Sequence, residues 1–275
     1  AFVRSTIKGT MMHEVGHTLG LKHNFKASTA LKLEQLSDKA FTDANSIANS
    51  VMEYVPINIA LKGERQGGYH RSALGPYDYW AIEYAYKPVE PGQEKSELAK
   101  IAARSVEPAL VYGDDLDAGG GGIYDGMDPL VNRFDLGDKP LAYYKKRLKL
   151  SQELWERVQA RKPLAGDDPL RARRSLLAGF GQLATISELT AKYVGGMHAL
   201  RDLPGTTGRP AFKPVDPAQQ REALQFLASG LFSSSSFKFK PEFLSALTLD
   251  YNEWERGAPL SIPAAVSRVQ LVALT

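Results

Sequence analysis

One segment near the start of the chain, HEVGHTLGLKH at residues 13–23, constrains the fold more than any other. His13 and His17 are four residues apart, so a helix of about 3.6 residues per turn presents both imidazoles on one face, one turn apart. Apolar residues recur with the same step, which predicts one helix with a buried stripe, capped by Ser5 or Thr6. The stripe consists of Ile7, Met11, Val15 and Leu19.

Two histidines on one helix face form half of a metal site, and the residues that follow them can complete it. A catalytic zinc holds three protein ligands and leaves its fourth position to water. His23 lies beyond Gly20, and a glycine in the left-handed conformation ends a helix and turns the chain, so His23 can swing back to the ion. Glu14 projects beside the metal, where its carboxylate can take a proton from zinc-bound water. Gly16, inside the helix, indicates a neighbour that packs closely there.

The composition limits the other kinds of site. The chain of 275 residues has no cysteine, which excludes disulfides, thiolate metal sites and cysteine nucleophiles and leaves a transition metal to His, Asp and Glu. The net charge of +3 is too small to imply a nucleic-acid or anionic-membrane partner. No run reaches the roughly 18 apolar residues of a membrane span. We therefore expect a folded protein with neither nucleic acid nor a membrane span among its interactions.

The histidine segment resembles the zinc-binding signature of the metzincin metallopeptidases, in which a glutamate-assisted zinc water hydrolyses peptide bonds. The second metzincin hallmark is a turn containing methionine beneath the metal, and SVMEY at residues 50–54 is similar to it. The resemblance implies one catalytic zinc ion, a peptide or protein substrate, and Met52 as the apolar floor under the imidazoles. It also implies that Tyr54 lies near the zinc, where it ligates the metal or stabilises the oxyanion of the tetrahedral intermediate.

A wider resemblance covers most of the chain and points to bacterial exported proteins described as Met-zincin-type zinc-dependent peptidases. It rests on four segments: HEVGHTLGLKHNFKAS, SVMEYVP, GPYDYWAIEYAY and LPGTTGRPAFKPV. That group implies a signal peptide and large upstream regions. We therefore expect the chain to be the C-terminal part of a longer exported protein, periplasmic, cell-surface or secreted. The missing N-terminal region would then be its partner and supply the other side of the substrate cleft.

The rest of the sequence predicts a mainly α fold with little β structure. Helical patterns are expected near residues 31–36, from 76 to 87, 96–110, from 140 to 162, from 169 to 197 with breaks at GFG and at Gly195 and Gly196, from 217 to 232, and, as a shorter helix, from 240 to 254. Residues 1–90 would hold the zinc-binding helix, the third-ligand turn, the Met turn and an aromatic helix. Residues 91–275 would be a helical region packed on them, in one continuous domain.

Several other charged groups have simpler interpretations than a functional site. The acidic stretch 113–129 carries four possible calcium ligands, Asp115, Asp117, Asp125 and Asp128. It lacks the register and the closing Glu of an EF-hand loop. We therefore favour a solvated loop and do not expect calcium. Asp78 and Glu83 could support the zinc histidines, although structural or surface pairing is favoured. His70 is predicted to lie in a loop, and His198 to end a helix. The RARR run at 171–174 is predicted to form a solvated face.

Two rival functions remain at the level of sequence. In the first, zinc only fastens the helix to the turn, and the long helical region binds a protein or a glycan; Glu14 argues against it because a structural site needs no base. In the second, a gluzincin-like enzyme takes a downstream Glu as its third ligand; His23 and Gly20 argue against that. We expect a zinc metalloendopeptidase.

Overall fold

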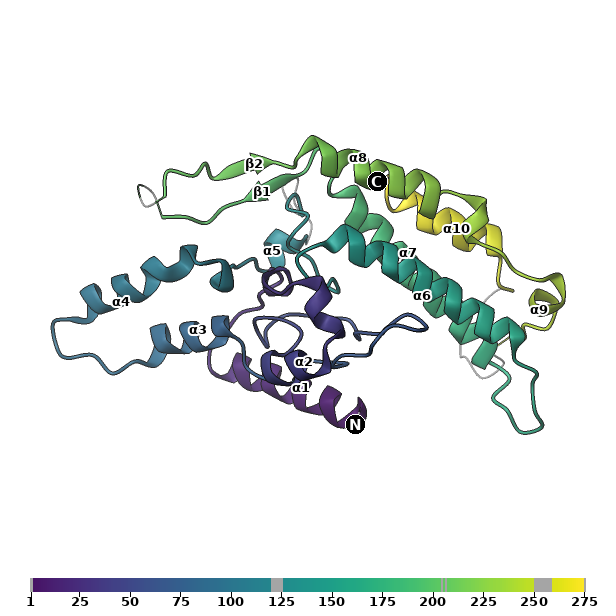
Figure 1. The fold of residues 1–275 in the computed structure, drawn as a ribbon, viewed down its shortest axis with the longest axis horizontal. Helices are drawn as coiled ribbons and strands as arrows, with labels where there is room; N and C mark the ends of the chain where they lie inside the picture. Colours follow the sequence, from purple (N-terminus) through teal and green to yellow (C-terminus); the bar gives the residue numbers. More distant parts are fainter. Residues whose placement is uncertain (1, 120–125, 204, 206, 250–258, 275) are drawn as a thin grey trace. The chain divides into compact units, whose positions relative to one another are not determined.

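The computed structural model describes residues 2–119, 126–203, 205, 207–249 and 259–274. The fold is mainly α, as predicted, and the described residues contain two short strands (Figure 1). The chain forms two compact units, residues 1–143 with 195–216 and residues 144–194 with 217–275. The predicted division at residue 90 stays a prediction.

The first unit holds the histidine segment and most of the short helices. Its elements, in which η1 to η4 are 3₁₀ turns, are α1 (Phe2–Thr18), η1 (Ala27–Ala30), η2 (Leu33–Ser37), α2 (Lys39–Asn45), α3 (Pro76–Tyr86), α4 (Glu94–Ala103), η3 (Arg104–Val106), η4 (Pro108–Leu110), α5 (Asp115–Ala118), β1 (Met197–Ala199) and β2 (Phe212–Pro214). Helix α3 begins at Pro76 as expected. The helix predicted for 96–110 ends at Ala103 and is followed by the 3₁₀ turns η3 and η4. Turn η4 begins at Pro108, which has no backbone N–H to extend the α-helix.

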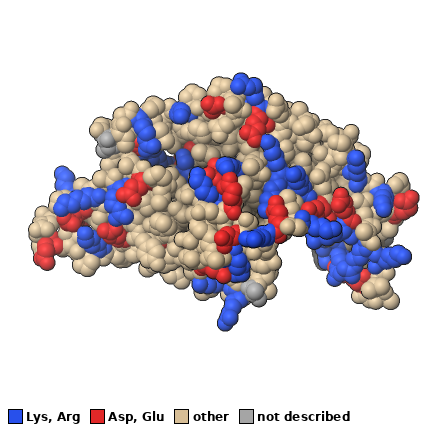
Figure 2. Space-filling view, in the orientation of Figure 1, with Lys and Arg blue, Asp and Glu red and all other residues tan. Residues whose placement is uncertain are grey.

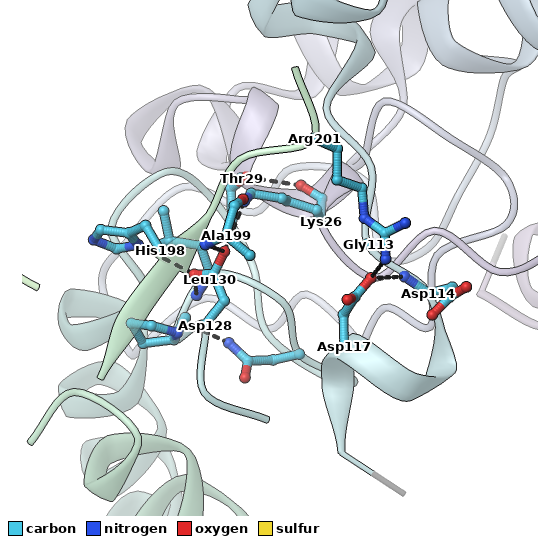
Figure 3. A network of polar contacts seen from close by, with 12 residues as sticks. Lys26, Thr29, Gly113, Asp114, Asp117, Asp128, Leu130, His198, Ala199 and Arg201 are labelled. Carbon is cyan, nitrogen blue, oxygen red and sulfur yellow. Dashed lines mark hydrogen bonds and ion pairs between the residues drawn. The ribbon is translucent and has the colours of Figure 1, made fainter. Parts of the chain in front are cut away.

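The two strands form an antiparallel hairpin in which Met197 pairs with Pro214, an element that the sequence did not predict. Figure 3 shows the Asp128 carboxylate beside this hairpin, where it accepts hydrogen bonds from the Ala199 backbone (3.1 Å) and pairs with His198 (3.1 Å) and Lys26 (2.7 Å). Burial by itself would raise the pKa of Asp128, but the bonds from His198 and Lys26 lower it to about 2. His198 lies on strand β1 and not at a helix end, where we had expected it.

The second unit is a set of helices around an aromatic core. Its elements, among which η5 is a π-helical turn and η6 a 3₁₀ turn, are α6 (Pro140–Ala160, which starts in the first unit), α7 (Arg171–Ala191), α8 (Pro217–Phe226), η5 (Leu227–Leu231), η6 (Ser234–Ser236), α9 (Pro241–Ser245) and α10 (Ile262–Leu271). Helix α6 follows the helical pattern predicted from residue 140 and buries Leu148 and Trp155. Helix α7 runs through GFG without the predicted break, because the missing side chain of Gly179 leaves room for the Trp155 indole.

The apolar stripe expected to bury α1 is instead exposed. Its residues have exposed fractions of 59%, 58%, 49% and 40% for Ile7, Met11, Val15 and Leu19. The buried face carries Gly9, His13 and Gly16. Two glycines let this face approach the loops beneath it, whereas three of the four stripe residues, all but Ile7, line a groove with residues of α3. The periodicity predicted the helix correctly and its buried face wrongly.

Charged side chains of both signs are interspersed over the face in view (Figure 2). At the start of α7, Arg174 is exposed and pairs with Asp168 at 3.0 Å, in agreement with the solvated face predicted for the RARR run. None of the described helices combines the length and apolar character needed to cross a bilayer.

Candidate metal centre

Helix α1 and the turn after it bring three histidines together. The Nε2 atoms of His13 and His17 lie 3.1 Å apart on the helix. Gly20 has a positive φ of 83°, the left-handed conformation predicted for it, and the chain turns there. His23 returns to the pair, so that one ligand nitrogen from each histidine lies within 4.8 Å of the others. The described residues contain no second group of this kind.

Each of the three rings is oriented through its Nδ1 atom. His13 Nδ1 lies 2.8 Å from the Val51 carbonyl, and His17 Nδ1 lies 2.9 Å from the Leu21 carbonyl. His23 Nδ1 lies 2.8 Å from the Asp115 carboxylate. All three partners are acceptors, so a neutral ring at each position carries its proton on Nδ1 and presents the lone pair of Nε2.

These residues fit a zinc ion. His23 Nε2 is buried and has no hydrogen-bond partner, which costs free energy unless another group occupies that position. Burial, together with the neighbouring charges of Arg71 and the other two histidines, lowers the pKa of His13, so this ring is neutral near pH 7. Three imidazoles, each with one ring nitrogen within 4.8 Å of the others, are a ligand set that zinc prefers.

The Met turn lies against the helix that carries His13 and His17. Met52 is fully buried, and a Cβ placed on Gly16 would lie 2.3 Å from its Sδ atom, so Gly16 is the close-packing position that the sequence indicated. The turn is held by the Ser50 hydroxyl, which accepts from Met52 N at 3.0 Å. Met52 O in turn accepts from Asn24 N at 3.1 Å, beside the third histidine. The turn thus contacts both parts of the histidine cluster.

Tyr54 and Glu14 lie beside the cluster in different ways. The Tyr54 ring is half-buried, with its centroid 4.6 Å from that of His23 and 5.3 Å from that of His13. Glu14 is exposed on α1, directly after His13. Tyr54 therefore contacts two of the three imidazoles, and the Glu14 side chain is open to solvent.

Arg71 is a buried residue of this centre that the sequence analysis missed. Its Nη1 atom donates hydrogen bonds to the carbonyls of Val51 and Glu53. Arg71 Nη1 lies 3.1 Å from His13 Nδ1, because both atoms contact the same Val51 oxygen. Next to it, burial and the charge of Asp135 raise the pKa of Glu53 well above its usual value. Neither residue lies in a periodic pattern, so nothing in the sequence indicated the contacts.

The acidic stretch 113–129 is only partly the solvated loop that we expected. Asp128 is 1% exposed, and Asp117 accepts from the Asp114 backbone (2.9 Å) and pairs with Arg201. Asp115 contacts His23, a partnership that no sequence pattern suggested. Asp125 lies outside the described residues. The absence of calcium stays a prediction.

Asp78 and Glu83 have the structural and surface pairings that we favoured. Asp78 is buried and binds the Met turn, whereas Glu83 pairs with Arg104 at the surface (2.8 Å). His70 lies in a loop, as predicted, and packs on Gly9 of α1. Burial and the neighbouring Arg71 charge lower the pKa of His70 to about 4, so it is neutral near pH 7.

Comparison with known proteins agrees with this geometry. The sequence model of a family described as Met-zincin matches residues 1–275, the whole chain. No curated protein and no solved structure matches it. A match of this extent supports a zinc metallopeptidase-like class for the chain, which implies zinc as the metal and peptides or proteins as substrates. The three-histidine cluster could hold that metal. The chain belongs to the Met-zincin family, a family of metzincin type.

Proposed function

We propose that this chain carries the catalytic centre of a zinc metalloendopeptidase, with His13, His17 and His23 as the metal ligands. The observation that supports it most is the convergence of one ring nitrogen from each of three histidines, each ring having its Nδ1 atom beside an acceptor. A structural zinc is usually closed by four protein ligands, whereas three ligands leave one position open. His23 supplies the third ligand, so a downstream Glu is not needed.

Zinc bound there would polarise the substrate carbonyl and lower the pKa of a water molecule to about 7. In the proposed mechanism Glu14 acts as general base, taking a proton from the attacking water and passing it to the leaving amine. The Tyr54 hydroxyl donates a hydrogen bond to the oxyanion of the tetrahedral intermediate. Met52 supports the imidazoles from below, and Gly20 allows the turn that returns His23 to the site.

A Glu14→Gln variant tests the role of the base. Gln keeps the size of the side chain but cannot accept the proton, so peptide hydrolysis should fall by about 10²- to 10⁴-fold. Zinc content by elemental analysis should stay at that of the native chain. The matched control is Glu83→Gln, the same change at the surface of α3, which should keep both hydrolysis and zinc.

Two results would contradict the proposal. If Glu14→Gln kept full hydrolysis with zinc bound, Glu14 would not be the base. If His17→Ala held as much zinc as the native chain, the histidine cluster would not be the metal site. Retention of zinc by a native chain that cleaves no peptide mixture would favour the rival interpretation, a non-catalytic module that binds a protein or a glycan.

A further inference from the structure

The three histidines do not share one kind of support. His13 and His17 are each held by a neutral backbone carbonyl, whereas His23 is held by the carboxylate of Asp115, at 2.8 Å. His23 also lies on the turn beyond Gly20 and not on the helix, so the regular backbone of α1 does not fix its ring. Its side chain therefore depends more than the other two on a partner from elsewhere in the chain.

Asp115 is itself held in place on its other oxygen. Arg133 Nη2 lies 3.1 Å from Asp115 Oδ1, and the Arg133 guanidinium lies 4.7 Å from the centroid of the Phe25 ring. Phe25 is fully buried and stacks on His23, with centroids 5.0 Å apart and ring planes 27° apart. The four side chains thus form a closed set of contacts in which each touches the next.

The backbone around Asp115 is held by contacts within and next to helix α5. Asp115 is the first residue of α5, and Asp114 caps this short helix by accepting from Leu116 N at 3.1 Å. Asp117 accepts from Asp114 N at 2.9 Å and pairs with Arg201, as Figure 3 shows. These contacts limit the positions that the Asp115 carboxylate can take.

We propose that Asp115 is a positioning residue for the metal centre. Its carboxylate holds His23 in the tautomer with the proton on Nδ1, which leaves the buried and unpartnered Nε2 directed at the metal position. A carboxylate behind a metal-ligating imidazole also makes that ligand more basic, and loss of such a partner typically weakens metal binding about 10- to 100-fold. The inference rests on the proposed zinc site but assigns no role in the chemistry to Asp115.

The test compares Asp115→Ala and Asp115→Asn with a matched control, Asp114→Asn. The control removes the same charge one residue away, from a carboxylate that pairs with Lys22 and not with a histidine. Asparagine remains a good helix cap, so the control should fold normally. Thermal melting of each metal-free chain checks that the fold is kept.

Two measurements decide the outcome, and neither depends on activity. The first is the tautomer of His23 in the metal-free chain, read from nitrogen-15 NMR of the imidazoles. The second is the zinc dissociation constant, from competition with a chromophoric chelator. In Asp115→Ala, His23 should lose the fixed Nδ1–H form, and zinc should bind about 10- to 100-fold more weakly. Asp115→Asn should fall between Ala and native because its amide oxygen still accepts, and Asp114→Asn should match the native chain.

Specific results would overturn the inference. A His23 that keeps the Nδ1–H tautomer in Asp115→Ala, or a zinc dissociation constant unchanged in that variant, would refute it. Equal losses in Asp114→Asn would show a general charge effect and would also refute it. If the native chain bound no zinc, the proposed function would fail, and the tautomer measurement would still decide whether Asp115 positions His23.

Discussion

Removal of the Asp78 carboxylate should destabilise the first unit strongly, because Asp78 joins helix α3 to the Met turn. Asp78 is 2% exposed, and its oxygens accept from the Ser50 hydroxyl (2.7 Å), Val51 N (3.0 Å) and Gly75 N (2.8 Å). The carbonyl of Val51 in turn holds His13. One buried side chain on α3 therefore fixes the backbone that orients a predicted zinc ligand.

The size of the effect follows from this list of contacts. Asp78→Ala leaves three buried donors without their acceptor, and each such loss costs about 1–3 kcal/mol. Relief of the desolvation of a buried carboxylate, which raises the pKa of Asp78, opposes part of that cost. We expect a net loss of about 3–5 kcal/mol, the range for breaking a buried charged network. That is a large part of the roughly 5–15 kcal/mol that stabilises a typical domain.

Urea unfolding of the metal-free chain, followed by circular dichroism and by tryptophan fluorescence, measures the loss. Trp80 lies on α3 and contributes a signal from the first unit, whereas Trp155 lies in the second. The control is Glu83→Gln on the same helix, which removes an exposed pair with Arg104 worth less than about 1 kcal/mol. Asp78→Asn should be intermediate because its amide still accepts. If Asp78→Ala cost no more than Glu83→Gln, the carboxylate would not hold the Met turn.

Three further predictions follow from single positions. Gly16→Ala should destabilise the fold by about 1–3 kcal/mol and lower the melting temperature, because the new Cβ would overlap Met52. Gly181→Ala, with open space around it, should stabilise the fold by up to about 1 kcal/mol and raise the melting temperature; equal shifts would contradict the packing. At Phe134, where φ is +68°, the Gly variant should be more stable than the Ala variant by about 1 kcal/mol in urea unfolding, and the reverse order would exclude backbone strain. The pKa of Asp128 falls on folding from 3.8 to about 2. The contribution of the ionised carboxylate to stability is therefore complete above about pH 4 and is lost as the pH falls towards 2. Asp128→Asn should flatten the fall in melting temperature between about pH 4 and pH 2, and an unchanged slope would refute the assignment.

The helices could be predicted to the extent that the signal is local. The start of α3 at Pro76 follows from a proline that fits the first helical turn, and helix α6 follows from a 3.6-residue period. The hairpin 197–199 and 212–214 could not be predicted in this way, because three-residue strands are too short to show alternation. The break predicted at GFG was wrong because Gly179 serves close packing with Trp155 and not helix termination.

The sequence by itself determined the chemical identity of the candidate centre. His13 and His17 must share a helix face, and Gly20 permits the turn that returns His23, since spacing and backbone freedom are properties of adjacent residues. The roles of Glu14 and Tyr54 stay predictions, as does export from the cell.

The tertiary structure alone decided what holds these residues. Asp115 and Arg133 support His23 from about 90 and 110 positions further along the chain, and the apolar stripe of α1 faces outward because glycines let the other face pack. Contacts between segments so distant in sequence depend on how the whole unit folds around them. No local pattern of residues encodes such contacts, because their free energy comes from burial and from the hydrogen bonds that complete it.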